Sequence, residues 1–337
     1  MAAFRLRLFG AIATSILGIA VAAPATAQTP DVTWKFAHEN RETVPAAKAA
    51  HILADAVAKK TGGHFKIQIY PAGQLGKEAQ LIEQLQLGTV QMAFTPTAPL
   101  SNFEPRLQLI DLPFLFPSRD AAYAVLDGPV GQELLAGLGK RGIKGLAFWE
   151  SGFKQMTSSV KPILSPADLS GQKVRTMQSP MLLEQYREWG ANPVAISFSE
   201  TYNALQQGVA DAQENPLVSI DSMRFYEVQK YLTLSNHGYT AFAVMANRKA
   251  YDSLPADYRK ALDEAVIEAR DAERKDSKQV DEELLKKISQ HMKIEELPAA
   301  GRQAFVKASR ELHKKYEGKV TKALLDKTYE QTKPFEK

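Results

Sequence analysis

The stretch from Gly171 to Asn215 constrains the fold more than any other part of the chain. Short apolar or β-branched runs alternate there with helical runs that proline and glycine bound. This order predicts a strand-helix-strand-helix-strand unit and implies a parallel sheet. Ligands of such units bind beyond the carboxyl ends of the strands. Because Arg175 stands near one such end and Asn215 at another, we expect an anion site in this stretch.

The N-terminal third has the same plan. Alternation in strands and apolar stripes in helices predict strands at 32–37, 64–70 and 90–94, and helices at 45–60 and 77–87. Pro113 excludes a central strand at 109–116, which is then an apolar loop packed on a core or a cleft lining. We also expect helices at 118–126, 129–138 and within 299–335, and strands at 143–149 and 242–246. Ser151 and Gly152 are the expected crossing between two lobes.

A very long helix is expected from Pro255 to about His291. Apolar stripes mark its two ends, whereas residues 270–283 are polar almost all round. A helix of this kind usually bridges solvent between two packed bodies. A coiled-coil dimer seam is the alternative, and the failure of the heptad positions in the middle weakens it.

The first 27 residues have the pattern of a secretory signal. Arg5 and Arg7 supply the positive flank, an apolar core reaches Ala22, and small residues form a cleavage site before Gln28. Cleavage would leave 310 of the 337 residues, enough for two domains, and no further apolar run as long as a membrane span. It would also lower the formal net charge from +4 to +2, too little to favour nucleic acid or an anionic membrane as partner. We therefore expect an exported protein of the periplasm.

No motif in the chain predicts catalysis, a metal or a cofactor. The absence of cysteine excludes disulfides, thiolate metal sites and a cysteine nucleophile. The six histidines have no metal-ligand spacing and no hydrolase motif occurs, although a set that assembles only in space stays open. Residues 137–142 match the dinucleotide-binding letters, but they follow a helix and precede a strand, the reverse of the required order. We interpret them as a helix end.

Arg175 and Asn215 each have a functional and a structural interpretation. Arg175 presents a planar fork to a carboxylate in a cleft, or it is an ordinary surface arginine. Asn215 precedes Pro216, so it caps a helix N-terminus, and a carboxamide there can also help to hold an anion. Three aromatic residues at strand ends are either core residues or ligand contacts: Trp149, Phe198 and Tyr239.

Five motifs along the chain resemble a known family. They are Pro71-Ala-Gly-Gln-Leu-Gly, Asp111-Leu-Pro-Phe-Leu-Phe, Gly152-Phe-Lys-Gln-Met-Thr, Pro166-Ala-Asp-Leu-Ser-Gly-Gln-Lys-Val-Arg175 and Asp211-Ala-Gln-Glu-Asn-Pro216. Together they resemble the extracytoplasmic solute receptors of tripartite ATP-independent periplasmic (TRAP) transporters, DctP type. The resemblance covers essentially the whole mature chain.

This resemblance implies a two-lobed α/β periplasmic-binding-protein fold, with crossing strands and a long helix that spans both lobes. After the signal peptide at 1–27, we expect lobe I to comprise 28–151 plus 241–280, and lobe II to comprise 152–240 plus 281–337. The long helix, at about 255–291, spans both. The lobes are expected to close on an organic acid.

The resemblance also implies the binding residues. The carboxylate-binding arginine of the family falls on Arg175, and its asparagine partner falls on Asn215. A second basic residue, often arginine in the family, falls on Lys154, which replaces a fork by a point charge. Other family contacts would fall at His38, Gln74, Thr95, Trp149, Phe198, His237 and Tyr239.

The implied function is that of a non-catalytic receptor that delivers a small carboxylate to a TRAP membrane permease. Lys154 and its motif resemble the four-carbon dicarboxylate branch, so succinate, malate or fumarate is the expected ligand. One alternative is a periplasmic enzyme that acts on a similar acid with His237 or His38 as base. Another is a ligand receptor for a sensor kinase. We expect a monomer without cofactor, metal or nucleic-acid partner.

Overall fold

The computed structural model describes residues 31–336 of the chain. The predicted signal peptide at 1–27 lies outside the described residues. Within 31–336, no helix combines the length and the apolar character that a membrane span needs.

One sheet is built from the N-terminal unit and two later strands. Its order is β2-β1-β3-β10-β4. The bounds are Val32–Ala37 for β1, Phe65–Tyr70 for β2, Met92–Pro96 for β3, Ile143–Phe153 for β4 and Tyr239–Asn247 for β10. β1 is parallel to β2 and β3, whereas β10 is antiparallel to β3 and β4. All nine residues of β10 are buried, which explains why its sequence is a mostly apolar run without alternation.

The second sheet has the order β11-β9-β5-β8-β6-β7. The bounds are Gln155–Ser158 for β5, Lys173–Thr176 for β6, Asn192–Ala195 for β7, Ala212–Asn215 for β8, Tyr231–Leu234 for β9 and Lys293–Glu296 for β11. β6 is parallel to both β7 and β8, so the parallel unit predicted within 171–215 is confirmed. The sequence patterns do not predict β5, β9 and β11, each of which has only four residues.

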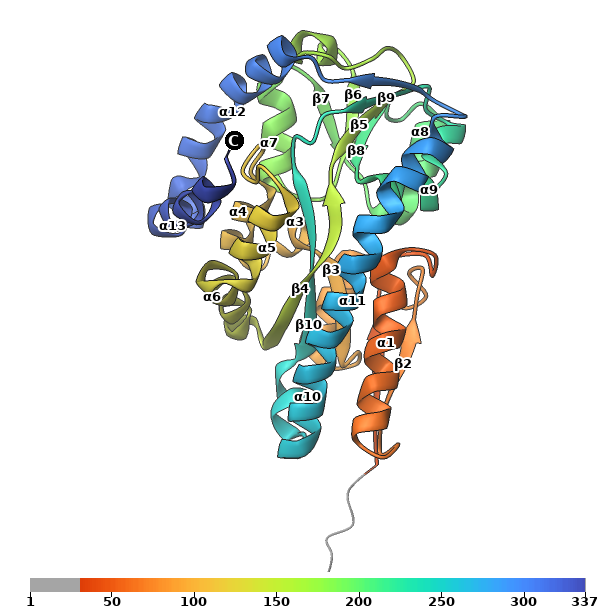
Figure 1. The fold of residues 1–337 in the computed structure, drawn as a ribbon, viewed down its shortest axis with the longest axis vertical. Helices are drawn as coiled ribbons and strands as arrows, with labels where there is room; N and C mark the ends of the chain where they lie inside the picture. The colour runs from red at the N-terminus through yellow and green to blue at the C-terminus, as the bar shows by residue number, and fades with distance from the viewer. Residues whose placement is uncertain (1–30, 337) are drawn as a thin grey trace, which may run out of the picture. The chain divides into compact units, whose positions relative to one another are not determined.

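Two strands carry the chain from one sheet to the other. β4 ends at Phe153 and β5 begins at Gln155, while β9 ends at Leu234 and β10 begins at Tyr239. β4 and β10 are paired with each other, and Figure 1 shows them running together between the sheets. The two crossing strands therefore form the connection that a two-lobed protein requires.

The predicted crossing at Ser151 and Gly152 is the last part of β4. Gly152 has a φ of 117°, a conformation that residues with a Cβ rarely adopt. Its partner in the ladder is Thr240, and the register shifts between Thr240 and Ala241. The strand pair is thus irregular at the point where it leaves the first sheet.

Thirteen α-helices lie within the described residues, and most begin where proline or a capping residue predicts. The bounds are Pro45–Lys60 (α1), Glu78–Leu87 (α2), Thr97–Leu100 (α3), Gln108–Asp111 (α4), Arg119–Asp127 (α5), Pro129–Gly137 (α6), Pro180–Glu188 (α7), Thr201–Gln206 (α8), Leu217–Ser222 (α9), Arg248–Ser253 (α10), Ala256–Ile288 (α11), Ala299–Val320 (α12) and Lys322–Thr332 (α13). Ser118 caps α5, because its Oγ accepts a hydrogen bond from the Ala121 amide at 3.2 Å. α2 ends at Gly88, which has a φ of 79°.

The long predicted helix is α11, with 33 residues. Its first half places Tyr258 and Leu262 in the core beside the first sheet, whereas Ile288 at its end joins a cluster with Leu232 of β9. It contacts α1 and β4 and then α9, and Figure 1 shows it passing from α10 to the level of α9. The predicted helix that spans both lobes is confirmed, because its two ends pack in different cores.

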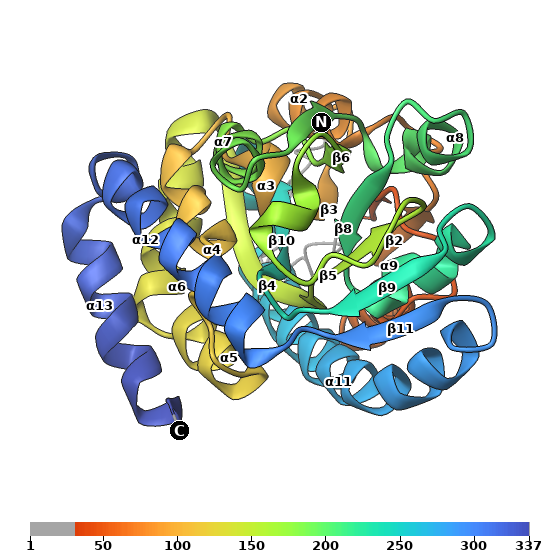
Figure 2. The ribbon, with the colours of Figure 1, turned by 90° about the horizontal axis from the view of Figure 1, so that it is seen from above.

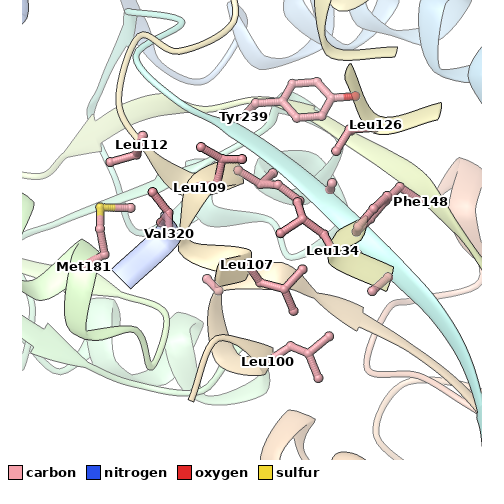
Figure 3. Close-up of a cluster of buried hydrophobic side chains, with 14 of the residues drawn as sticks. Leu100, Leu107, Leu109, Leu112, Leu126, Leu134, Phe148, Met181, Tyr239 and Val320 are labelled. Atoms are coloured by element: carbon pink, nitrogen blue, oxygen red, sulfur yellow. The ribbon is translucent and has the colours of Figure 1, made fainter. Parts of the chain in front are cut away.

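The largest hydrophobic cluster includes side chains that are far apart in sequence. Leu107, Leu109 and Leu126 pack there with Leu324 of α13 and with Met181 of α7. Figure 2 shows α12 and α13 beside α4, α5 and α6, and Figure 3 draws part of the cluster. The apolar run 109–116 is thus packed on a core, as one of the two predicted alternatives has it. The residue boundaries of the two lobes stay a prediction.

Candidate ligand-binding site

A cavity lies at the carboxyl ends of strands from both sheets. The empty space among its lining atoms, with the solvent at its mouth included, is about 410 Å³. Its polar lining comes from Glu39, Asn40, Glu78, Thr95, Ser151, Asn215, Ser219 and Thr240, and its apolar lining from Leu81, Phe94, Pro96, Met177, Phe198 and Phe242. Asn215 is the last residue of β8, and Pro96 is the last residue of β3. The position therefore agrees with the rule for ligand sites in α/β sheets.

Arg175, the third residue of β6, is completely buried. Its Nε donates a hydrogen bond to the carbonyl oxygen of Ile196 at 2.9 Å. Neither of its terminal nitrogens has a hydrogen-bond partner among residues 31–336. Burial lowers the pKa of Arg175, an effect that the nearby carboxyl groups of Glu78, Glu214 and Glu39 oppose. A surface arginine is thus excluded, because this guanidinium is buried and most of its donors are unused.

Arg175 does not itself line the cavity. Met177, two residues further along, and Asn215 on the adjacent strand β8 do line it. Among the carboxyl groups that oppose the lowering of the Arg175 pKa, Glu78, another lining residue, has the largest effect. Arg175 therefore lies close to residues of the cavity wall without being one of them.

Lys154, which connects β4 to β5, is also buried but has a partner. Its Nζ donates to Glu214 Oε1 at 2.9 Å, and each side chain is 1% exposed. Glu214 Oε2 accepts further hydrogen bonds from Tyr186 at 3.1 Å and from His237 Nε2 at 2.8 Å. Burial raises the pKa of Glu214, but the Lys154 charge and the His237 hydrogen bond outweigh it and hold the pKa at about 2. The positive charge of Lys154 is thus compensated inside the protein.

The histidines predicted as ligand contacts are neutral. Burial lowers the pKa of His237. Since a carboxylate only accepts, Nε2 carries the proton toward Glu214, and Nδ1 accepts from the Ser235 hydroxyl at 2.7 Å. Burial also lowers the pKa of His38 to about 4, and its ring stacks on Phe94 with centroids 4.5 Å apart. Neither ring lines the cavity, although Phe94 does.

Two carboxyl groups from the first sheet face the cavity. Glu39 follows β1, Glu78 opens α2, and both are less than 10% exposed. The Glu78 amide donates to Glu39 Oε2 at 3.3 Å, and the Phe198 amide donates to Glu78 Oε1 at 3.4 Å. Burial, together with the neighbouring Glu78 side chain, raises the pKa of Glu39 to about 9. At neutral pH the pair therefore keeps a proton on Glu39.

The structure brings together only some of the residues predicted from the sequence. Thr95, Phe198 and Asn215 line the cavity. Trp149 belongs to a core cluster and donates from Nε1 to the Val266 carbonyl oxygen at 3.4 Å. Tyr239 packs edge-on against Phe116 and Phe153 in the largest cluster, where Figure 3 labels it. Gln74 is exposed in the turn after β2. Ligand contacts of these residues stay predictions.

One structural interpretation needs correction. Asn215 does not cap a helix, because the residue in the cap position of α9 is Pro216, with extended backbone and no side-chain cap. The Asn215 carboxamide instead donates from Nδ2 to Gln213 Oε1 at 2.6 Å. The proline starts the helix one residue later than expected, and this leaves the Asn215 side chain in the cavity wall.

Sequence reasoning did not find Glu39, Glu78, Ser151 and Thr240. Glu39 follows a predicted strand, and Glu78 follows a predicted turn, so the rule for strand ends could have marked the first of them. A glutamate in such places is usually a surface residue, and nothing in the local sequence distinguishes the two cases. No group of three or more histidine, aspartate or glutamate side chains within the described part of the chain could hold a metal ion.

The chain is similar to a known protein family and to known proteins. The family model of the bacterial extracellular solute-binding proteins, family 7, matches residues 36–319. The C4-dicarboxylate-binding protein DctB of Bacillus subtilis (strain 168) is 36% identical over 288 residues, which cover 85% of this chain and 82% of DctB.

Solved structures of solute-binding proteins are also similar to this chain. The sugar acid binding protein DctPAm of Advenella mimigardefordensis, in complex with galactonate, has a TM-score of 0.89 and 34% identity, over 91% of this chain and 100% of that chain. A TRAP periplasmic solute binding protein of Sulfurospirillum deleyianum, with bound succinate, has a TM-score of 0.85 and 36% identity, over 89% and 99%. The predicted two-lobed fold is thus confirmed, and the chain belongs to the bacterial extracellular solute-binding proteins of family 7.

Proposed function

We propose that the protein is the extracytoplasmic receptor of a TRAP transporter, and that it binds a small organic acid with Arg175 as the carboxylate anchor. The observation that carries this proposal is the buried guanidinium of Arg175, whose terminal nitrogens have no partner within 31–336. A buried charge is costly unless an opposite charge with hydrogen-bonding atoms compensates it. A carboxylate supplies both, because its two oxygens match the two parallel N–H donors of the fork.

The ligands of related proteins support an organic acid. The Advenella protein is in complex with galactonate, the Sulfurospirillum protein has bound succinate, and the Bacillus relative is named for C4-dicarboxylates. These acids differ in length and in the number of carboxylates, but each has at least one carboxylate. The cavity lining combines apolar side chains with a set of polar ones, as sites for small molecules commonly do.

The location and the partner follow from the same proposal. The predicted signal peptide would place the mature chain in the periplasm, where a receptor of this family would present its ligand to the membrane permease. The permease is therefore the protein partner that we propose. A receptor closes on its ligand and then releases it, so binding has to be reversible.

The alternative of an enzyme has less support. An enzymatic base has to reach the substrate, but neither His237 nor His38 lines the cavity. His237 is also engaged on both ring nitrogens, and a histidine such as His38 with a pKa of about 4 is a weak base at neutral pH. We therefore propose that the protein binds its acid without changing it.

The test is a binding experiment on the purified mature chain. Small organic acids are added one at a time, the melting temperature is measured, and the acid is recovered and identified by NMR. A receptor gives a higher melting temperature, equivalent to about 2.7 kcal/mol at a ligand concentration of 100 Kd, and returns the acid unchanged. Chemical conversion of an acid would favour the enzyme, and a panel without any effect would reject an organic-acid receptor.

A further inference from the structure

We propose that the cavity selects an acid with one carboxylate and with hydroxyl groups at its other end, and that Glu39 and Glu78 discriminate against a second carboxylate. This inference rests on the proposed function, because it takes Arg175 as the anchor of the single carboxylate. It differs from the four-carbon dicarboxylate that the resemblance implies. The chemical class is that of the aldonates and related hydroxy acids.

The cavity has carboxyl groups on its first-sheet side. Glu39 and Glu78 both line it and are 8% and 5% exposed. The amide of Glu78 donates to Glu39 Oε2 at 3.3 Å, so the two residues are adjacent. An ionised carboxylate only accepts hydrogen bonds. A second ligand carboxylate at this place would lie beside the negative charge that remains on the pair, where little solvent screens it.

The cations near the cavity can compensate the charge of one ligand carboxylate. Arg175 has two terminal nitrogens without a partner in the described chain, whereas the Nζ of Lys154 is 2.9 Å from Glu214. Burial lowers the pKa of both His38 and His237, so neither ring adds a positive charge at neutral pH. A dicarboxylate would therefore bring two negative charges to one uncompensated cation.

Hydroxyl groups fit the same surface. A hydroxyl donates one hydrogen bond and accepts others, so it can satisfy both a carboxylate and a protonated carboxyl group. The hydroxyls of Thr95 and Thr240 line the cavity, are at most 5% exposed, and have no hydrogen-bond partner in the part of the chain that the structure describes. Buried polar atoms of this kind usually have partners. Ligand hydroxyls would supply partners for these threonines and for the glutamate pair.

A purely structural role accounts for Glu39 but not for Glu78. Glu39 accepts the first free amide of α2, which is a common way to satisfy a helix N-terminus. This contact accounts for one carboxyl group. It does not account for Glu78, whose side chain lies beside Glu39, raises the Glu39 pKa, and leaves a protonated pair in the cavity wall.

The test uses pairs of acids that differ at one end only. Erythronate is compared with meso-tartrate, and galactonate is compared with galactarate, so that a terminal CH₂OH becomes a carboxylate. Isothermal calorimetry on the wild-type chain should give an aldonate affinity about ten- to a hundredfold higher than that of the matching diacid, a difference of about 1.4 to 2.8 kcal/mol. A diacid that binds as tightly as its aldonate overturns the inference.

Two variants locate the discrimination. The double variant Glu39→Gln with Glu78→Gln removes the acidic pair and should reduce the preference to about threefold or less. Glu83→Gln is the matched control, because Glu83 lies on the same helix but is exposed, and it should leave the preference unchanged. If the double variant folds and keeps the wild-type preference, the pair is not the discriminating group.

The design separates this inference from the proposed function. If no acid of the panel binds, or if Arg175→Ala binds them all as wild type does, the organic-acid receptor itself is rejected. If diacids bind preferentially and lose affinity in Arg175→Ala, the receptor stands and the inference fails. An amino acid that binds more tightly than both aldonates would also overturn the inference, since the pair would then select an ammonium group. The wild-type comparison decides even if the double variant does not fold.

Discussion

Arg175 in β6 and Lys154, which directly precedes β5, are both buried cations, yet their surroundings differ. Lys154 is held by Glu214, which in turn accepts from Tyr186 and His237. Arg175 uses only Nε, and its terminal nitrogens find no partner within 31–336. The fold thus compensates the charge of Lys154, whereas the terminal nitrogens of Arg175 are available to a ligand.

This difference separates a structural charge from a binding charge. A buried ion pair with saturated hydrogen bonds contributes to stability and specificity of the fold, and breaking it leaves an uncompensated charge. A buried cation with free donors is unfavourable until a ligand arrives, and that deficit favours binding. The charge of Lys154 is already compensated by Glu214, so Arg175 is the stronger candidate for the anchor.

Breaking the Lys154–Glu214 pair should have the largest effect. Lys154→Met leaves the Glu214 carboxylate buried without its cation, and we expect the free energy of unfolding to fall by about 3 to 5 kcal/mol in urea denaturation. Adding Glu214→Gln should recover part of the loss. Lys161→Met is the control, since Lys161 pairs with Asp168 at the surface and should change stability by about 1 kcal/mol or less. A change of that small size in Lys154→Met would contradict a buried pair.

Removing Arg175 should act on affinity and not on stability. Arg175→Ala should weaken the bound acid by about 2 to 5 kcal/mol, or about thirtyfold to several thousandfold in Kd, because the ligand carboxylate loses its charged partner. The melting temperature without ligand should not fall, because a buried cation without a partner does not stabilise the fold. Arg175→Lys keeps the charge but loses the fork, so it should restore only part of the affinity.

The control for this series is Arg187→Ala. Arg187 lies on α7, its side chain is 59% exposed, and calorimetry should give the wild-type Kd. Tight binding by Arg175→Ala, or loss of its fold, would show that Arg175 is not the anchor.

Lowering the pH should also test the contribution of Glu214 to stability. The pKa of Glu214 in the fold is about 2, below its ordinary value of 4.5, so its contribution to stability is present above pH 4.5 and is lost as the pH falls toward 2. The loss should be on the order of 3 kcal/mol, because lowering a pKa by one corresponds to about 1.4 kcal/mol. In Glu214→Gln the stability is lower, but this part of its decline between pH 5 and 2 should be absent. An equally steep decline in the variant would assign the acid sensitivity to other carboxyl groups.

The contribution of Glu39 to stability should depend on pH in the opposite direction. Its pKa is raised to about 9, so its contribution to stability is present below pH 4.5 and is lost as the pH rises toward 9. The groups that face it include the side chain and the backbone amide of Glu78 and the side chain of Ser199. Glu39→Gln should therefore make the free energy of unfolding less dependent on pH between 5 and 9. The measurement is urea denaturation at several pH values.

Much of the fold could be predicted because its signals are local. Alternation, proline at helix starts and glycine at helix ends mark β1, α1, α2 and the parallel unit of β6, β7 and β8. β5 was missed because three of its four side chains are polar, and two of these are satisfied internally: Thr157 donates to Gln229 at 2.9 Å, and Ser158 donates to Gln172 at 2.8 Å. A four-residue strand with such contacts has no apolar alternation that could identify it.

The site could be predicted only where strand ends indicate it. Arg175 and Asn215 follow from that rule and from the family motifs. Glu39 and Glu78 did not, because their burial depends on packing between residues 120 positions apart, as in the contact from the Phe198 amide to Glu78. The compensation of Lys154 is equally nonlocal, since Glu214 is 60 residues away in sequence. Local patterns carry no information on such contacts.

Asn215 should have the smallest effect, and it separates the cavity from the family motifs as guides to the site. Its carboxamide lines the cavity and uses one donor on Gln213 at 2.6 Å, which leaves the remaining amide atoms for a ligand. Asn215→Ala should weaken binding by about two- to tenfold, as expected for a neutral hydrogen bond of ~0.5 to 1.5 kcal/mol. Gln74→Ala is the comparison, because Gln74 is also named by the motifs but is exposed outside the cavity, so its Kd should stay at the wild-type value. A larger loss in Gln74→Ala than in Asn215→Ala, measured by calorimetry with the same acid, would mean that the bound state recruits residues that this cavity does not include.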